Sequence, residues 1–350
     1  MMIPSCSFDV YGFRFTVQST AEEALRGIEQ DFAFFRSDAP AAIKIDLIEE
    51  DPPVDGLPLS DAIVYTPRNV TYRRGHLRYI DYHGRALGIQ DTNTGSYKLY
   101  ARDSNLLYEA TYLYVLSQIG RYLDSRGLHR MHALGITIKE RAVLVLLPMG
   151  GGKSTLGLEL LKNPDVQLLS DDSPFIDRKG NVLAFPLRLG LLPGSENAVP
   201  AEHRRVINRM EFGPKHLVNY SYFRNRVQPS AAPGIVFIGA RTLAATCRIE
   251  EAGIGRAFKA CVANCVVGVG LFQGLEFILR ATPFELCKNS LVGTSRLRNC
   301  IELLRRSRAV CQIHLGRNSQ LNAETLVEYA NAHLARPAED TPSVLSRACQ

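Results

Sequence analysis

The segment from Ala142 to Leu161 constrains the fold of this chain more than any other part of the sequence. An unbroken apolar run, Ala142 to Leu147, is followed by Pro-Met, three glycines, Lys-Ser-Thr and a short helix pattern. A run that is apolar at every position is typical of a parallel strand covered on both faces. Strand, glycine loop and helix in this order predict an α/β fold with the loop at the carboxyl end of a strand.

The loop Gly150-Gly151-Gly152-Lys153-Ser154-Thr155 has the residue types of a phosphate-binding loop. Glycines let backbone N–H groups turn toward a phosphate, and the next helix presents the positive end of its dipole. A lysine then reaches the β and γ oxygens, and a hydroxyl ligates Mg²⁺. Gly152, Lys153 and Ser154 fit the G-x-x-x-x-G-K-[ST] pattern, but Leu147 replaces its first glycine. The alternative is a glycine-rich turn with a chance lysine, which the flanking strand and helix disfavour.

A second signal is Ser170-Asp171-Asp172, which follows the next apolar run, Val166 to Leu169. Ligands of parallel α/β sheets bind at the carboxyl ends of strands, so we expect both carboxylates beside the phosphate loop. One carboxylate suffices to hold Mg²⁺, and a second can take the proton from an attacking hydroxyl. The pair therefore favours phosphoryl transfer to an alcohol. The alternative is a solvated turn, because Ser-Asp-Asp-Ser-Pro is also common turn composition.

The segment from His132 to Ile176 resembles the HPr kinase/phosphorylase family and its relative, ATP-dependent phosphoenolpyruvate carboxykinase. The likeness lies in His132-Ala133-Leu134-Gly135, the apolar strand, the loop with Lys153-Ser154, and Leu168-Leu169-Ser170-Asp171-Asp172. In general architecture the chain is more similar to the HPr-kinase-like kinases that phosphorylate a serine of lasso-peptide precursors. The resemblance implies an α/β fold, namely a phosphoenolpyruvate-carboxykinase-like P-loop kinase domain that binds ATP and Mg²⁺.

The same resemblance implies a role for each site residue. Lys153 would contact the β and γ phosphates, and Ser154 would bind Mg²⁺. One of Asp171 and Asp172 would bind the metal while the other is the catalytic base. His132 would lie close to the transferred phosphate; taken alone, a histidine before a strand is more often a structural group.

The predicted function is that of an ATP-dependent kinase that transfers the γ-phosphate to a hydroxyl. The preferred acceptor is a serine of a peptide or protein, with a small-molecule alcohol as the alternative. The same site could also catalyse the reverse reaction, phosphorolysis of a phosphoserine. A sensor or scaffold that binds ATP and transfers nothing is the alternative from another class. Leu147 favours that alternative, and the aspartate pair opposes it.

The chain is predicted to comprise a small α+β domain (1–103), the kinase domain (104–335) and a loose tail (336–350). The first domain has an alternating run, a helix pattern and Tyr-rich segments with the composition of an antiparallel meander. From Ser104, apolar residues recur every three or four positions, which predicts a helix that closes at Gly127. Further elements are expected at Val182–Phe185, Ile235–Ile238, Ser295–Arg306, Val310–Leu315 and Ala323–Leu334.

Phosphoryl transfer also needs cations around the negative charge of the transition state. The stretch from Glu202 to Arg226 is interpreted either as a mobile lid over nucleotide or acceptor, or as a solvated loop. Its basic residues are Arg204, Arg205, Arg209, Lys215, Arg224 and Arg226. Arg188 is a further candidate cation. A second basic run is predicted to be a solvated helix face, or else a docking surface for an acidic peptide: Arg296, Arg298, Arg305, Arg306 and Arg308.

Composition narrows the class of protein. The 350 residues carry 41 Lys and Arg against 35 Asp and Glu, an excess too dilute to indicate nucleic-acid binding by itself. Eight scattered cysteines without a C-x-x-C pair argue against structural zinc and indicate reduced thiols of a cytoplasmic protein without a secretory signal. The apolar stretch Ala257–Leu279 contains Lys259 and Glu276, so we predict a core segment and no membrane partner. The oligomeric state, including a homo-oligomer, stays open.

Overall fold

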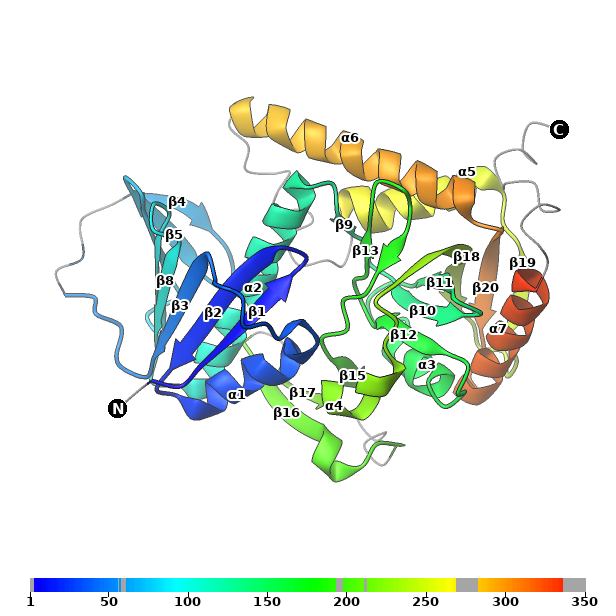
Figure 1. The fold of residues 1–350 in the computed structure, drawn as a ribbon, viewed down its shortest axis with the longest axis horizontal. Coiled ribbons are helices and arrows are strands. Elements are labelled where there is room, and N and C mark those ends of the chain that lie inside the picture. Colours follow the sequence, from blue (N-terminus) through cyan, green and yellow to red (C-terminus); the bar gives the residue numbers. More distant parts are fainter. Residues whose placement is uncertain are drawn as a thin grey trace. The chain divides into compact units, whose positions relative to one another are not determined.

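The computed structural model describes residues 3–55, 57, 61–192, 198–210, 213–268 and 283–335, with side chains of the last range described from residue 290. The chain forms two compact units (Figure 1). Unit 1 comprises residues 1–119 and 196–221, and unit 2 comprises residues 120–195 and 222–350. The predicted tail, 336–350, and the end of the apolar stretch, 269–279, lie outside the described residues. The domain boundary after residue 103 stays a prediction.

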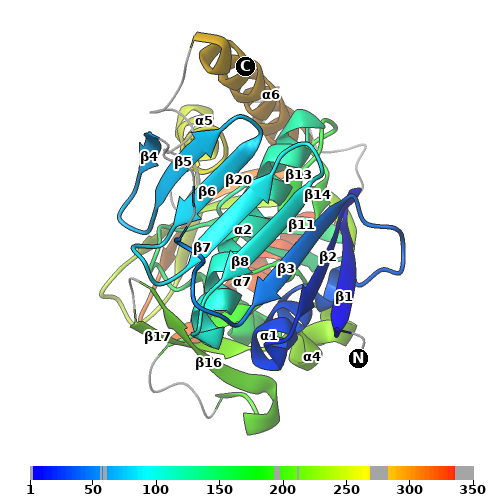
Figure 2. The ribbon, with the colours of Figure 1, turned by 90° about the vertical axis from the view of Figure 1, so that its left-hand side faces the viewer.

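Unit 1 is built on an eight-stranded sheet with the order β1-β2-β3-β8-β7-β6-β5-β4 (Figure 2). Pairing is antiparallel except between β2 and β3 and between β3 and β8, which are parallel. The strands are β1 (Ser5–Val10), β2 (Phe13–Ser19), β3 (Ile43–Ile48), β4 (Ala62–Tyr65), β5 (Val70–Arg74), β6 (Leu77–Asp81), β7 (Leu87–Asp91) and β8 (Ser96–Tyr100). The predicted antiparallel meander is present as β5 to β8, and it includes β7, which was not predicted from the sequence. Strand β4, which pairs with β5, was not predicted either.

Helices cover one face of this sheet. They are α1 (Glu22–Asp31), the short η1 (Ala33–Phe35) and α2 (Ser104–Ser125), which begins in unit 1 and ends in unit 2. Tyr97 of β8 stacks on Tyr114 of α2 with ring centroids 3.7 Å apart, and both rings are buried. The helix predicted from Ser104 is confirmed, and Gly127 after its end has the positive φ of a helix-terminating glycine.

The alternating run from Phe8 to Val17 is a hairpin, not a single strand. Tyr11 and Gly12 both have positive φ, 52° and 91°, so they form the two-residue turn that the twist of a hairpin favours. Phe8 consequently lies opposite Phe15, and both side chains are buried. The remaining element of unit 1 is a hairpin of β16 (Arg204–Arg209) and β17 (Gly213–Val218), preceded by η3 (Ala201–His203).

Unit 2 has a central mixed sheet. The order β12-β10-β11-β18 continues through β20 to β19, and a small extension of β14, β13 and β9 pairs with the start of β18. The strands of this sheet are β9 (His129–Arg130), β10 (Leu134–Ile138), β11 (Arg141–Leu146), β12 (Gln167–Ser170), β13 (Phe175–Ile176), β14 (Val182–Leu183), β18 (Ser230–Arg241), β19 (Arg248–Glu251) and β20 (Ala309–Leu315). Strand β15 (Leu189–Leu191) belongs to a separate small sheet.

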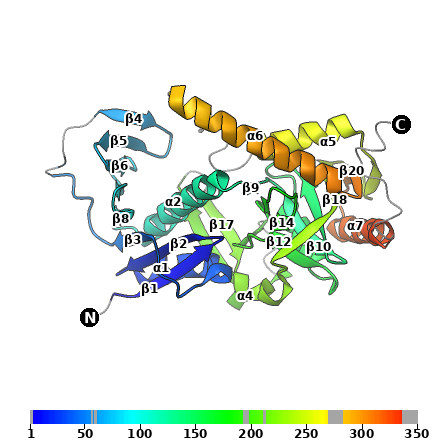
Figure 3. The same ribbon diagram turned by 45° about the horizontal axis from the view of Figure 1, so that its top comes forward.

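Helices cover both faces of the sheet of unit 2, which gives this unit a layered α/β architecture (Figure 3). One layer holds α3 (Lys153–Leu160) and α7 (Ser319–Leu334), which contact each other. The other holds α5 (Ile254–Cys261), the π-helical η5 (Val262–Val267) and α6 (Pro283–Arg306). Short α4 (Tyr220–Phe223) and η4 (Arg224–Arg226) precede β18. In the part of the chain that the structure describes, no helix is long and apolar enough to cross a membrane.

Strand direction determines where the loops of unit 2 meet. Strand β11 runs parallel to β18, and β18 runs parallel to β20. Strand β10 lies between β11 and β12 and is antiparallel to both, so β11 and β12 also run in the same direction. The carboxyl ends of β11, β12 and β18 therefore meet at one edge of the sheet, which is where α/β sheets bind ligands.

Candidate functional site

The loop Leu147–Gly152 joins β11 to α3 at this edge, as the sequence analysis predicted. Gly150 and Gly152 have positive φ, 74° and 93°, which favours glycine, and Gly152 is the N-cap residue of α3. The Gly151 N–H donates to the Pro148 carbonyl at 3.0 Å, and a Cβ on Gly151 would lie only 2.9 Å from that oxygen. All three glycines are thus needed for the curled backbone.

Leu147, which replaces the first glycine of the phosphate-loop pattern, packs in the core of unit 2. Its side chain is buried and lies over Gly239 of the neighbouring strand β18. A Cβ on Gly239 would lie 2.4 Å from Leu147 Cδ2 and 2.6 Å from its Cγ, far inside contact distance. Gly239 therefore makes room for the leucine, and the loop closes without the first glycine of the pattern.

This packing leads to a prediction for Gly239→Ala. We expect the variant to be destabilised by about 1–3 kcal/mol, because the new methyl group overlaps Leu147 in a packed core. Urea unfolding followed by circular dichroism measures this effect.

The matched control is Gly255→Ala in α5, where an added Cβ meets no atom within 4 Å. That variant should be neutral or slightly more stable, since alanine favours a helix over glycine. Equal behaviour of the two variants would contradict the packing argument.

Lys153 is buried and directed back toward its own loop. Its Nζ lies 2.8 Å from His132 Nε2 and donates to the Leu147 carbonyl at 2.9 Å. Asp172 Oδ1 lies 3.7 Å from the same ammonium. Burial lowers the pKa of Lys153, although the two neighbouring aspartates oppose that shift. The lysine is thus held by neutral and anionic acceptors in a site that already disfavours its positive charge.

His132 is positioned by both its backbone and its ring. Its N–H donates to the Asn264 carbonyl of η5 at 2.9 Å, and the side chain is almost completely buried. Because Lys153 donates to Nε2, the proton of a neutral ring is assigned to Nδ1, which has no hydrogen-bond partner among the described residues. Asp172 Oδ1 approaches the same Nε2 to 3.2 Å.

The two aspartates after β12 have different surroundings. Asp171 is 8% exposed and accepts a 2.6 Å hydrogen bond from the Ser154 hydroxyl in the first turn of α3. The side chain of Asp172 is 57% exposed and lies beside His132 and Lys153. The hydroxyl of Ser170 donates to the Phe185 carbonyl at 2.9 Å and accepts from the Ser173 N–H, which fixes the turn. Thr155, also a predicted site residue, is half-buried beside Ser154.

The oxygens of Ser154 and Asp171 fit a magnesium ion. Mg²⁺ prefers hard oxygen ligands and usually binds through one or two carboxylates, waters and the phosphates of a substrate. Within the described ranges, no group of three or more His, Cys, Asp or Glu side chains could hold a metal by itself. Ser154 and Asp171 would therefore hold the ion together with a nucleotide.

The described residues of the stretch from Glu202 to Arg226 form strands and short helices, whereas the sequence predicted a mobile lid or a solvated loop. Arg205 lies in β16 and donates to the buried Asp31 of α1, to Gln30 Oε1 at 2.6 Å and to the Gly27 carbonyl at 3.1 Å. Arg226 donates to the main-chain carbonyls of Asn163 and Val166. These two guanidinium groups are part of the folded units, so the interpretation of the stretch as a lid is wrong for them.

The other predicted cations of that stretch lie in two units. Arg204, Arg209 and Lys215 belong to the β16–β17 hairpin of unit 1, whereas Arg224 is exposed in η4 of unit 2. Arg188 is half-buried just before β15.

The second basic run is also not a uniform solvated face. Arg306 donates to the Lys179 carbonyl and to Asn181, and Arg308 donates to the Leu334 carbonyl at 2.9 Å. Arg305 pairs with Glu302 on the surface of α6, and Arg298 is exposed.

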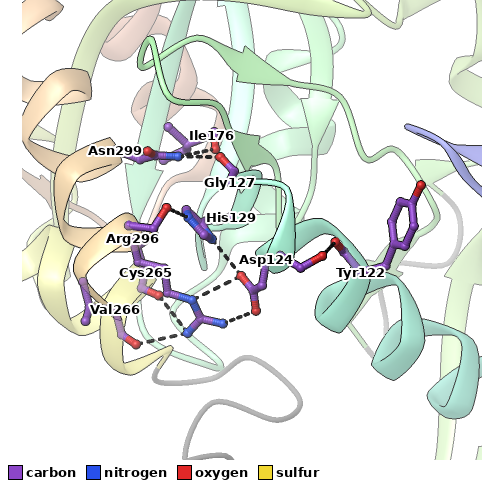
Figure 4. A network of polar contacts seen from close by, with 11 residues as sticks. Tyr122, Asp124, Gly127, His129, Ile176, Cys265, Val266, Arg296 and Asn299 are labelled. Carbon is purple, nitrogen blue, oxygen red and sulfur yellow. Dashed lines mark hydrogen bonds and ion pairs between the residues drawn. The ribbon is translucent and has the colours of Figure 1, made fainter. Parts of the chain in front are cut away.

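Arg296 is the least expected of this group, because it lies in a polar network inside unit 2 (Figure 4). It forms an ion pair with Asp124 of α2 at 2.6 Å and donates to the Val266 carbonyl at 3.1 Å. Asp124 also contacts His129 Nδ1 at 2.8 Å. Burial would raise the pKa of Asp124, but the hydrogen bond from His129 and the charge of Arg296 hold it below its ordinary value. The network therefore stabilises the fold above that ordinary pKa and loses its contribution as the pH falls.

The order Asp124–His129–Ser295 also matches the hydrogen-bond order of a hydrolase triad, since Ser295 Oγ lies 2.8 Å from His129 Nε2. The His129 side chain is fully buried, and Asp124 is already ion-paired with Arg296. A substrate cannot reach this imidazole. We assign the network a structural role in joining α2 and β9 to η5 and α6, next to the Asn264 carbonyl that holds His132.

One residue of the site was missed by the sequence analysis. Arg241, the last residue of β18, is exposed, and its Nη1 lies 3.2 Å from the position that a Cβ would take on Gly152. It reaches the loop because β18 is the parallel neighbour of β11. Its only signal in the sequence is its place shortly after the apolar run Ile235–Ile238.

Known proteins resemble this chain only distantly in sequence and in structure. No family model matches the chain. The ATP-dependent DNA helicase hus2/rqh1 of Schizosaccharomyces pombe is 27% identical over 203 residues, which cover 50% of this chain and 14% of the helicase. The HPr(Ser) kinase/phosphatase of Coxiella burnetii is similar in structure over 59% of this chain and 99% of its own, with 14% identity and a TM-score of 0.27. The chain thus spans about a seventh of the length of the helicase.

Proposed function

We propose that this protein is an ATP-dependent phosphotransferase that moves the γ-phosphate of ATP to a hydroxyl group. The observation that carries the proposal is the convergence of five side chains at the carboxyl edge of the unit 2 sheet. Lys153, His132 and Asp172 lie within 3.7 Å of one another, and Ser154 is bonded to Asp171 next to them. A glycine loop and a helix N-terminus complete the arrangement that phosphoryl transfer uses.

The different exposure of the two aspartates supports different roles. Asp171, buried against Ser154, would hold a magnesium ion, which when bound offsets the charge of the phosphates. Asp172, exposed and close to His132, would take the proton of the acceptor hydroxyl. The acceptor oxygen forms a bond to the γ-phosphorus as the bond to the bridging oxygen of ADP breaks. The proton moves to the Asp172 carboxylate, and ADP leaves with the bridging oxygen.

His132 would act by holding Asp172. In the present arrangement Lys153 occupies the His132 Nε2 lone pair. When Lys153 turns to the phosphates, that nitrogen is released 3.2 Å from Asp172 Oδ1, and in the other tautomer it can donate a hydrogen bond to the carboxylate. The ring would then keep the base aimed at the acceptor.

The acceptor that we propose is a serine of a peptide or protein. The exposure of Asp172 supports it, because a hydroxyl on a large substrate can reach an exposed base without entering a closed pocket. The choice of serine rests on the sequence resemblance to HPr-kinase-like kinases. Leu147, the feature that favours a non-catalytic sensor, is accommodated by Gly239 and leaves the loop curled.

The test is transfer of label from γ-labelled ATP with Mg²⁺ to a panel of serine-bearing peptides, small alcohols and host-cell extract. We expect the purified protein to label a peptide or protein acceptor and Lys153→Ala to label none, because the variant removes the cation of the loop. Binding of unlabelled ATP is measured in parallel. Labelling by Lys153→Ala at the wild-type rate, or ATP binding by the wild type with no transfer in any extract, would contradict the proposal.

A further inference from the structure

The side chains of the candidate site carry too little positive charge to offset the phosphates of a nucleotide. Lys153 is the only basic residue among the five converging side chains when His132 is neutral, whereas Asp171 and Asp172 supply two carboxylates. ATP brings further negative charge, and the transition state of phosphoryl transfer spreads it over the γ-phosphate oxygens. Even with a magnesium ion, a site of this kind gains from another cation aimed at the phosphates.

Two basic residues of unit 2, Arg226 and Arg296, already have other partners in the fold. Arg226 is engaged with main-chain carbonyls between α3 and β12, and Arg296 is paired with Asp124. Arg241 differs from both. It makes no hydrogen bond or ion pair with the described residues, and its guanidinium lies over Gly152, directly before the loop lysine.

We propose that Arg241 binds the phosphate chain of ATP and stabilises its charge during transfer, an inference that rests on the proposed function. The planar guanidinium presents two N–H groups side by side, which matches two phosphate oxygens. An exposed arginine that has no partner among the described residues can make these bonds without first breaking an ion pair with any of them. Gly152 leaves space for this guanidinium, because a Cβ there would lie 3.2 Å from Nη1, closer than an ordinary van der Waals contact.

Calorimetric binding of ATP, ADP and adenosine tests the inference with Arg241→Ala and Arg241→Lys. We expect Arg241→Ala to lose roughly 10- to 100-fold in affinity for ATP, the usual range for a hydrogen bond to a charged group, and to keep its affinity for adenosine. Arg241→Lys should recover part of the lost ATP affinity, because lysine keeps the positive charge but lacks the two adjacent N–H groups of the guanidinium. Arg298→Ala is the control for net charge, since Arg298 is exposed on α6.

The outcomes separate this inference from the proposed function. Unchanged ATP affinity and turnover in Arg241→Ala, beside their loss in Lys153→Ala, would overturn the role of Arg241 and leave the kinase standing. An equal loss of ATP and adenosine affinity would also overturn it, because the residue would then act on the nucleoside or on folding. A wild-type protein that binds no nucleotide would remove both proposals.

Discussion

Asp172→Asn should lower kcat for phosphate transfer by roughly 10²- to 10⁴-fold, the range that general-base catalysis contributes. The amide keeps the size of the carboxylate but cannot accept the proton of the acceptor hydroxyl. ATP affinity should be unchanged or higher, because the substitution removes a negative charge 3.7 Å from Lys153 Nζ. Single-turnover transfer with saturating ATP, combined with a binding titration, measures both effects.

Asp171→Asn is the matched comparison. Its loss should appear chiefly as a higher Mg²⁺ requirement, since the amide is a weaker metal ligand beside Ser154. Excess Mg²⁺ should therefore restore part of the activity of Asp171→Asn and none of that of Asp172→Asn. The opposite pattern would reverse the roles that we propose for the two aspartates.

Arg205→Ala should destabilise unit 1 by about 3–5 kcal/mol. The variant removes the ion pair of Arg205 with the Asp31 carboxylate, which is 1% exposed and also accepts a 2.6 Å hydrogen bond from the Tyr108 hydroxyl. A buried charge that loses its partner retains its desolvation cost, which accounts for the size of the effect. Urea unfolding followed by circular dichroism gives the change in free energy.

Arg102→Ala is the control for this measurement. Arg102 pairs with Asp51 at 2.7 Å, but both side chains are mostly exposed, so solvent screens the interaction. We expect no measurable change for this variant. If Arg205→Ala and Arg102→Ala unfold at the same urea concentration, the ion pair with Asp31 does not stabilise unit 1.

Local patterns predicted those parts of the fold that depend on neighbouring residues. The periodicity after Ser104 gave the bounds of α2 closely, and the apolar run before the glycine loop is β11. Strand β10 was missed, although its hairpin with β11 closes through Lys139 and Glu140, both at positive φ. Neither residue is a common choice for such a turn, so composition offered no signal there.

Features that depend on pairing between distant segments could not be predicted. The sequence predicts the aspartate pair beside the phosphate loop, but it does not predict that β10 lies between β11 and β12. The basic character of Arg205, Arg226 and Arg241 is visible in the sequence, but their partners are not. Asp31 for Arg205, and Gly152 for Arg241, are brought close only by the folded units. The same limit explains why a helix with many arginines was predicted to be solvated although Arg296 is enclosed.

The place of Arg205 in unit 1 affects the order in which the chain can fold. Residues 120–195 are synthesised before residues 196–221, so the ribosome makes part of unit 2 before it completes unit 1. Until Arg205 emerges, Asp31 lacks the ion pair with Arg205 that offsets part of the cost of its burial. Contacts of such long sequence separation also slow folding, because the entropy of closing a long loop must be lost first. Unit 1 can therefore reach its complete fold only after residues 120–195 of unit 2 have been translated.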